Sequence, residues 1–199
     1  MSKCCRVVLT GGPGGGKTTA ADLYRREIGE GVVVVREAAT LLYTGGFPRG
    51  GEIGVRRATQ KAIYYVQTNL EDAQFASYQD RVLLCDRGTV DGAIYWPNEP
   101  DDFFASLNTS LEKELARYDA VLFFETAAVG NISIEGGNPI RIESNDEALL
   151  LDHKLQQLWS QHPRFIFIPH NASFIKKINH GLRELEKIIE QLHLDRDPS

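Results

Sequence analysis

The sequence predicts one α/β domain built on a five-stranded parallel sheet that is flanked by helices. Two observations support this fold class. Apolar runs of strand length alternate with amphipathic stretches of helix length, and the first apolar run leads directly into a glycine-rich turn. The chain has 199 residues, 42% of them hydrophobic, which suffices for one sizeable core. We therefore expect a single domain over residues 1–199.

Five apolar runs are the predicted strands. They cover residues 5–10, 31–37, 81–86, 120–125 and 164–169. Between and after them, apolar side chains recur every three or four residues, as on one face of a helix. One of these helices begins at "SNDE" (144–147), where a serine and a glutamate three positions later form a capping box, and Pro163 marks its end.

Residues 11–18 match the pattern G-x-x-x-x-G-K-[ST] between a predicted strand and a predicted helix. Glycines let successive N–H groups turn inward around a phosphate, and the following helix points its positive dipole end at the same anion. We expect Lys17 to reach the β- and γ-phosphates of a triphosphate and the Thr18 hydroxyl to ligate Mg²⁺. The residues assigned to the nucleotide are Gly12, Pro13, Gly14, Gly15, Gly16, Lys17, Thr18 and Thr19.

The segment "LLCDRG" (83–88) ends the third predicted strand beside this loop. Asp86 stands where Mg²⁺ needs a direct or water-mediated oxygen ligand, although it could instead cap the next helix. Arg87 either binds phosphate through its planar fork or forms a surface ion pair. AAA+ motors commonly place a water-polarising glutamate at this second position, so the arginine favours phosphate binding over hydrolysis.

These segments together resemble the nucleoside and nucleotide kinase branch of P-loop proteins. The resemblance rests on the strand and P-loop, the acid in "VVREAAT" and the segment "DRGTVDGAIYW". It is strongest with nicotinamide-riboside-kinase-like ATP-binding domains, which are often labelled as AAA-family ATPases. It implies a three-layer P-loop NTPase fold with sheet order 2-3-1-4-5, ATP as donor with Mg²⁺, and a lid near residues 127–144 that carries Arg141.

The same resemblance implies roles for residues around the acceptor. In similar deoxynucleoside kinases, a glutamate at the position of Glu37 accepts the proton of the acceptor hydroxyl. The alternative for Glu37 is a salt bridge to Arg36 or Arg87. Asp91, one helical turn after Arg87, either orients that arginine, binds an acceptor hydroxyl or lies on a helix surface.

A further contact to the nucleotide is implied after the fifth predicted strand. The loop "IPHNASF" falls where related kinases cover the adenine, so main-chain groups of Asn171 and Ala172 would contact the base. Alternatively, Asn171 or Ser173 caps the last helix.

The helix predicted over about 55–77 carries two stripes of side chains. A mostly apolar face consists of Ala58, Ala62, Tyr65, Val66, Asn69 and Ala73. A second stripe consists of Arg57, Gln60, Tyr64, Gln67 and Glu71. The second stripe either lines a pocket for a nucleoside-like acceptor or is a solvated outer face. Arg49 and Arg56 add positive charge nearby, which favours an anionic acceptor.

Charge and cysteine content limit the partners and the compartment. The net charge of −5 argues against a dedicated nucleic-acid or membrane-surface protein. Three cysteines without disulfide or zinc spacing suit a reducing cytoplasm. No apolar run is long enough for a signal peptide or a membrane span, so we expect a soluble monomer or homodimer.

The residues therefore favour an ATP-dependent kinase for a small nucleoside-like or anionic acceptor. In this interpretation Lys17, Arg87 and Arg141 spread the charge of the transferring γ-phosphoryl group. A regulatory or mechanical NTPase without an acceptor is the main alternative. A polynucleotide or lipid kinase is a third possibility, which the overall acidity disfavours and a local patch of arginines would favour.

Overall fold

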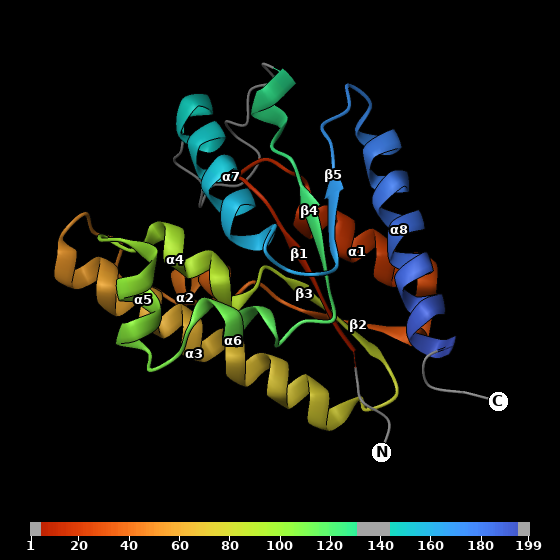
Figure 1. The fold of residues 1–199 in the computed structure, drawn as a ribbon, viewed down its shortest axis with the longest axis horizontal. Helices are drawn as coiled ribbons and strands as arrows, with labels where there is room; N and C mark the ends of the chain where they lie inside the picture. The colour runs from red at the N-terminus through yellow and green to blue at the C-terminus, as the bar shows by residue number, and fades with distance from the viewer. Residues whose placement is uncertain (1–4, 131–143, 195–199) are drawn as a thin grey trace.

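The computed structural model of the chain describes residues 5–130 and 144–194, with side chains through Gln191. At its centre lies a five-stranded, all-parallel sheet with the order β2-β3-β1-β4-β5 (Figure 1). The strands are β1 (Cys5–Thr10), β2 (Val32–Val35), β3 (Val82–Asp86), β4 (Ala120–Phe124) and β5 (Phe165–Ile168). The predicted fold class and the implied strand order are both confirmed.

Helices cover both faces of the sheet and give the fold three layers (Figure 1). One face packs against α1 (Lys17–Ile28) and α8 (Phe174–Leu194). The other packs against α3 (Ile53–Ser77), α4 (Gly92–Tyr95), α5 (Pro100–Ser106), α6 (Leu111–Leu115) and α7 (Asn145–Trp159). The short α2 (Ala38–Thr44) follows β2, and three single turns are η1 (Gly29–Gly31), η2 (Thr89–Asp91) and η3 (Ala127–Gly130).

Both faces of the central strands are buried, which explains their continuous apolar sequence. In β1, Val7 and Leu9 face the α1/α8 layer, whereas Val8 faces the opposite layer. Every residue of β4 is buried. Parallel strands with helices on both faces need this composition, because neither face meets water.

Strands β2, β4 and β5 end one or two residues earlier than predicted, whereas β1 and β3 end where predicted. Strand β2 ends at Val35, so Glu37 is the N-cap residue of α2 and not the last residue of the strand. Its position beyond the carboxyl end of the sheet is unchanged. The capping box at Ser144 and Glu147 is confirmed, and the helix that it begins ends at Trp159, before Pro163.

The predicted apolar face of α3 is wrong. Tyr65 is 53% exposed, and Ala58, Asn69 and Ala73 are also exposed. The polar stripe faces inward instead, and its Glu71 is fully buried.

Two buried side chains of this stripe, Gln67 and Glu71, have hydrogen-bond partners, which lowers the cost of burying them. Glu71 accepts hydrogen bonds from Arg117 Nη2 and Tyr118 Oη, both at 2.8 Å. Gln67 Nε2 donates to Glu71 at 3.1 Å, which links the stripe along the helix. Within the described residues, 5–130 and 144–194, no helix is long and apolar enough to cross a bilayer.

Candidate functional site

The P-loop, residues 11–18, lies between the end of β1 and the first turn of α1. Gly11 and Gly16 have φ angles of +126° and +89°, which favour residues without a side chain. A Cβ atom on Gly11 would also lie 2.1 Å from the carbonyl oxygen of Phe124. The glycines therefore allow the loop to curl at the N-terminus of α1 and to press against β4.

Lys17 lies inside this curl. Its side chain is 1% exposed, and Nζ donates to the carbonyl oxygens of Gly11 at 2.7 Å and Gly12 at 2.8 Å. The structure thus fixes the ammonium group within the loop where a phosphate tail is expected. The hydroxyl-bearing Thr18 and Thr19, by contrast, are exposed at the start of α1.

Asp86 ends β3 beside the P-loop and is only 2% exposed. Burial raises the pKa of Asp86, and the nearby Glu37 carboxylate raises it further. The nearby Thr18 hydroxyl lowers the pKa of this carboxyl group, but by less. Within the described residues, Asp86 Oδ1 is buried without a hydrogen-bond partner. A buried oxygen of this kind next to a threonine hydroxyl fits a divalent cation, because Mg²⁺ prefers oxygen ligands.

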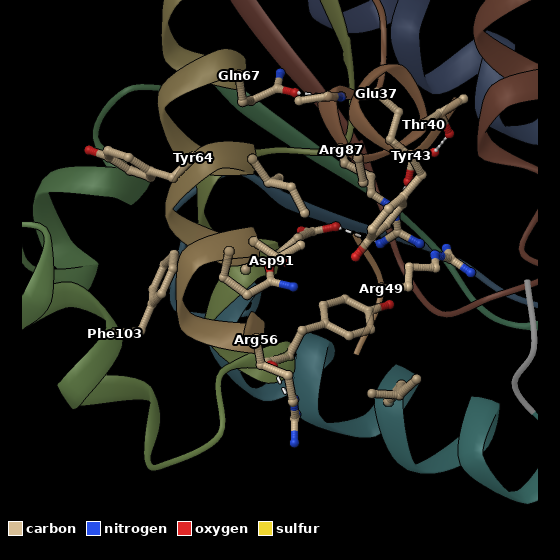
Figure 2. Close-up of a pocket in the computed structure, with 18 of the residues that line it drawn as sticks. Glu37, Thr40, Tyr43, Arg49, Arg56, Tyr64, Gln67, Arg87, Asp91 and Phe103 are labelled. Atoms are coloured by element: carbon tan, nitrogen blue, oxygen red, sulfur yellow. Dashed lines mark hydrogen bonds and ion pairs between the residues drawn. The ribbon is translucent and has the colours of Figure 1, made fainter. Parts of the chain in front are cut away.

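Arg87 follows in the left-handed region, with a φ of +73°. Its main-chain N–H donates to the carbonyl of Leu9 at 3.0 Å. Its guanidinium joins two carboxylates: Nε donates to Glu37 Oε1 at 2.5 Å and Nη1 to Asp91 Oδ2 at 2.7 Å (Figure 2). Three residues predicted separately thus form one cluster. Of the five N–H donors of an arginine, these two bonds use only two.

Glu37 is held ionised in this cluster. Its Oε2 accepts the hydroxyl of Thr40 at 2.5 Å. Burial alone would raise the pKa of Glu37, but the Arg87 guanidinium, the Thr40 hydroxyl and the Lys17 ammonium outweigh it and lower that pKa. The salt bridge to Arg87, weighed above as an alternative, is present. Each oxygen of Glu37 accepts only one of these hydrogen bonds, and the side chain is 16% exposed. Glu37 can therefore accept a further hydrogen bond, although its lowered pKa makes it a weak base.

Asp91 is buried and binds the guanidinium of Arg87. In addition to Arg87, it accepts Thr10 Oγ1 and Trp159 Nε1 at Oδ1, both at 2.7 Å. Both carboxylate oxygens are therefore engaged. Of the roles weighed from the sequence, these contacts favour orienting Arg87 over binding an acceptor hydroxyl.

A cavity of about 780 Å³, here called the side cavity, opens next to the P-loop (Figure 2). It borders the P-loop at Pro13, and Glu37, Arg87 and Asp91 form one part of its wall. Its aromatic and apolar wall includes Tyr43, Ile63, Tyr95, Phe103, Leu150 and Leu151. The residues that line the side cavity come from segments far apart in sequence, from Pro13 to Leu151.

The polar stripe of α3 contributes part of this cavity. Gln60 is 7% exposed and lines it, and so does Tyr64, although the Tyr64 hydroxyl turns away and donates to Glu114 Oε1 at 2.9 Å (Figure 2). Arg57 is not among the lining residues. It pairs with Asp102 at 2.6 Å and lies over the ring of Trp96. Of the five residues of the stripe, Gln60, Tyr64 and Gln67 thus line the side cavity, whereas Arg57 and Glu71 do not.

Two exposed arginines lie at the mouth of the side cavity. Arg49 lies over the ring of Tyr43, 4.0 Å from its centroid. Arg56 donates from Nη2 to the carbonyl of Tyr95 at 2.9 Å. Both guanidinium groups line the opening, where they could meet an anionic group of a ligand.

The predicted lid region is described only in part, whereas the predicted adenine loop is fully described. Arg141 lies outside the described residues, and of the predicted lid only the turn η3 and Ser144 are described. Asn171 and Ala172 are exposed before α8. Asn171 Oδ1 accepts the N–H of Ser173 at 2.9 Å, and Ser173 Oγ accepts the N–H of Lys176 at 3.4 Å. Ser173 thus acts as the cap that the sequence offered as an alternative.

Two charged side chains at the P-loop were missed by sequence reasoning. Asp152 of α7 accepts the N–H of Gly12 at 2.7 Å, and Lys177 of α8 donates to the carbonyl of Gly15 at 2.9 Å. A signal existed for the first, because Asp152 lies four residues after Ala148 and three before Leu155, on the apolar stripe of its helix. A charged residue on a buried stripe indicates a specific partner.

Comparison with known proteins bears on this geometry. A search of curated proteins finds no match. Residues 6–174 match the model of a family described as AAA domain, a segment that includes the P-loop, Asp86 and the side cavity. This family is of the P-loop NTPase type, whose members generally bind ATP with Mg²⁺. With most of its length matched and its fold and P-loop in agreement, the chain belongs to the AAA-domain family of P-loop NTPases.

Proposed function

We propose that the protein is an ATP-dependent kinase that transfers the γ-phosphoryl group to a small acceptor bound in the side cavity. The observation that carries this proposal is the cavity of about 780 Å³ beside the P-loop. Hydrolysis needs only one water molecule at the γ-phosphate, whereas a space of this size suits a small-molecule ligand. The Glu37–Arg87–Asp91 cluster lies in its wall, where donor and acceptor would meet.

The side chains of the site suit in-line phosphoryl transfer. The acceptor hydroxyl oxygen forms a bond to the γ-phosphorus while the bond to the β–γ bridging oxygen breaks, and ADP leaves. Glu37 receives the hydrogen bond of that hydroxyl and finally its proton. Arg87, held by its two carboxylates, and Lys17 stabilise the charge on the moving group. Thr18 and Asp86 would hold Mg²⁺, which supplies charge neutralisation between the phosphates.

The lining of the side cavity suggests the chemistry of the acceptor. Tyr43 and Tyr95 offer faces for a ring, and Gln60 offers an amide to read its polar edge. Arg49 and Arg56 at the mouth suit a negatively charged group. A nucleoside-like or anionic acceptor matches these features.

The remaining parts of the proposal concern residues at the edges of the site. Arg141 would add positive charge at the γ-phosphoryl group, and the main chain of Asn171 and Ala172 would contact the adenine. We place the protein in the cytoplasm as a monomer or homodimer. An NTPase without an acceptor is the competing function, because the family match supports nucleotide turnover of either kind.

An acceptor screen tests the proposal. ADP release from Mg·ATP is measured with the full chain against panels of nucleosides, nucleotides, sugars and inositol lipids. We expect at least one acceptor to raise ADP release well above the rate with water alone, and the phosphorylated product to appear in equal amount. Turnover that no acceptor increases would favour the NTPase function. A steep loss of acceptor binding with salt would instead indicate a polyanionic partner.

A further inference from the structure

Two buried charged side chains hold the P-loop from opposite faces of the sheet. Asp152 belongs to α7 and Lys177 to α8, and these helices lie on different sides of the sheet (Figure 1). Asp152 Oδ1 accepts the N–H of Gly12, and Lys177 Nζ donates to the carbonyl of Gly15. The acid thus binds a main-chain donor of the loop and the cation binds a main-chain acceptor.

Both side chains also bind the two residues that follow β4. Asp152 Oδ1 accepts a second hydrogen bond from the N–H of Thr126 at 3.0 Å. Lys177 Nζ makes its second bond to the carbonyl oxygen of Glu125. Each charge therefore ties the loop to the segment directly after β4, the strand next to β1. The Thr126 hydroxyl adds a direct bond to the carbonyl of Pro13 at 2.5 Å.

The burial of these charges is costly. Asp152 and Lys177 are 6% and 4% exposed. Burial raises the pKa of Asp152 and lowers the pKa of Lys177 to about 8. Well-packed apolar side chains commonly stabilise a core at least as well as buried charges do. Their use here therefore points to the hydrogen bonds that they make. All four bonds of Asp152 and Lys177 end on main-chain atoms of the P-loop or of the two residues after β4.

We propose that Asp152 and Lys177 are positioning residues for the nucleotide. They hold Gly12 and Gly15 in place, so that the N–H groups of the P-loop are oriented before a phosphate arrives. A loop with its shape already fixed loses less conformational entropy on binding. Neither residue lines the side cavity, so their effect falls on nucleotide affinity through the loop.

Nucleotide binding by the full chain tests this proposal without any acceptor. The affinity for Mg·ADP is measured by calorimetry in Asp152→Ala, Lys177→Met and the conservative Asp152→Asn. We expect roughly tenfold weaker binding or more for the first two, since fixing a loop in its bound shape is worth this order of affinity. Asp152→Asn keeps an oxygen that accepts both N–H groups, and we expect its affinity to stay within about twofold of the parent.

A core variant of the same helix provides the matched control. Leu155→Ala removes a fully buried side chain from α7 and lowers stability without touching the P-loop. We expect its affinity for Mg·ADP to match the parent at a temperature where circular dichroism shows it folded. If Asp152→Ala does not fold, Asp152→Ser takes its place, and Lys177→Met remains an independent measurement.

The proposal is overturned by either of two results. One is parent-like affinity in folded Asp152→Ala, or Asp152→Ser, and in Lys177→Met. The other is an equal loss of affinity in Leu155→Ala, which would assign the effect to stability alone. Because no acceptor is present, the outcome does not depend on whether the protein is a kinase.

Discussion

The P-loop and the mouth of the side cavity differ in how firmly the rest of the protein holds them. Around the P-loop, Lys17, Thr126, Asp152 and Lys177 all bond to main-chain atoms of the loop, and all four are buried. At the mouth, Arg49 and its neighbours Gly50 and Gly51 are exposed. Buried side chains therefore hold the loop on the nucleotide side, whereas exposed residues form the mouth.

This difference separates two kinds of specificity. A rigid loop recognises a phosphate chain that is the same in every nucleoside triphosphate, so its shape can be built in advance. A mouth formed by exposed side chains recognises one particular acceptor and can change by substitution without disturbing the core. Substitutions at the loop should therefore strongly weaken nucleotide binding, and substitutions at the mouth should change the affinity for the acceptor by a smaller factor.

The largest effect is expected at Lys17. In Lys17→Ala, the ammonium inside the loop is lost, and we expect Mg·ATP affinity to fall on the order of a hundredfold, since charged hydrogen bonds to an anion are worth up to about 3 kcal/mol. Calorimetry measures this affinity. Arg25→Ala, an exposed position on the same helix, should bind like the parent. Full activity in Lys17→Ala would exclude the phosphate-binding role.

An intermediate effect is expected at Glu37, where the two regions meet. Glu37→Gln removes the charge that faces Arg87 and the group that takes the acceptor proton. We expect phosphoryl transfer to fall by roughly a hundredfold, at the lower end for a general base because the pKa of Glu37 is lowered. Nucleotide affinity should change little. The transfer rate is measured with the acceptor found in the screen.

The exposed Glu52→Gln serves as the control for this substitution. It removes one carboxylate near the start of α3 and should leave the transfer rate unchanged. A Glu37→Gln protein as active as the parent would reject the proton-accepting role, and simultaneous loss of nucleotide affinity would assign Glu37 to the P-loop region.

The smallest effect is expected at Arg49. Arg49→Gln removes an exposed cation from the mouth, and we expect KM for an anionic acceptor to rise about fivefold, since exposed charge pairs contribute at most about 1 kcal/mol. The affinity of Arg49→Gln for Mg·ATP should stay constant. Arg26→Gln, at the distant end of α1, is the control, and both its affinity for Mg·ATP and its KM for the acceptor should match the parent. A change in ATP affinity at Arg49 would show that the two regions are coupled.

Local patterns were sufficient to predict the fold class and the five strands, whereas the strand order followed from the resemblance to P-loop kinases. Each strand is a short run whose side chains are nearly all apolar, and the glycines of residues 11–16 can only serve a tight main-chain turn. The capping box at Ser144 was equally visible, because its two residues bond to each other's main chain across one turn. Such features depend on neighbours in sequence, so they can be read before the fold is known.

The candidate site was predictable only in part, because its contacts cross long distances in sequence. Asp86 and Arg87 followed from a strand ending at the P-loop. The bonds from Asp152 to Gly12 and from Lys177 to Gly15 join residues 140 and 162 positions apart. On α3, partners as distant as Arg117 and Tyr118 decide that Glu71 is buried. Periodicity alone cannot identify such partners, so it assigned the wrong face.

The left-handed backbone at Arg87 has a consequence for how this protein could be stabilised. A φ of +73° costs a residue with a side chain roughly 1–2 kcal/mol, a penalty that glycine would not incur. Glycine here would remove that penalty, but it would also leave the largely buried carboxylates of Glu37 and Asp91 without their cation, a loss that commonly costs about 3–5 kcal/mol. The ion pairs of Arg87 thus outweigh the strain of its own backbone, and a glycine that relaxes this turn would make the protein melt at a lower temperature.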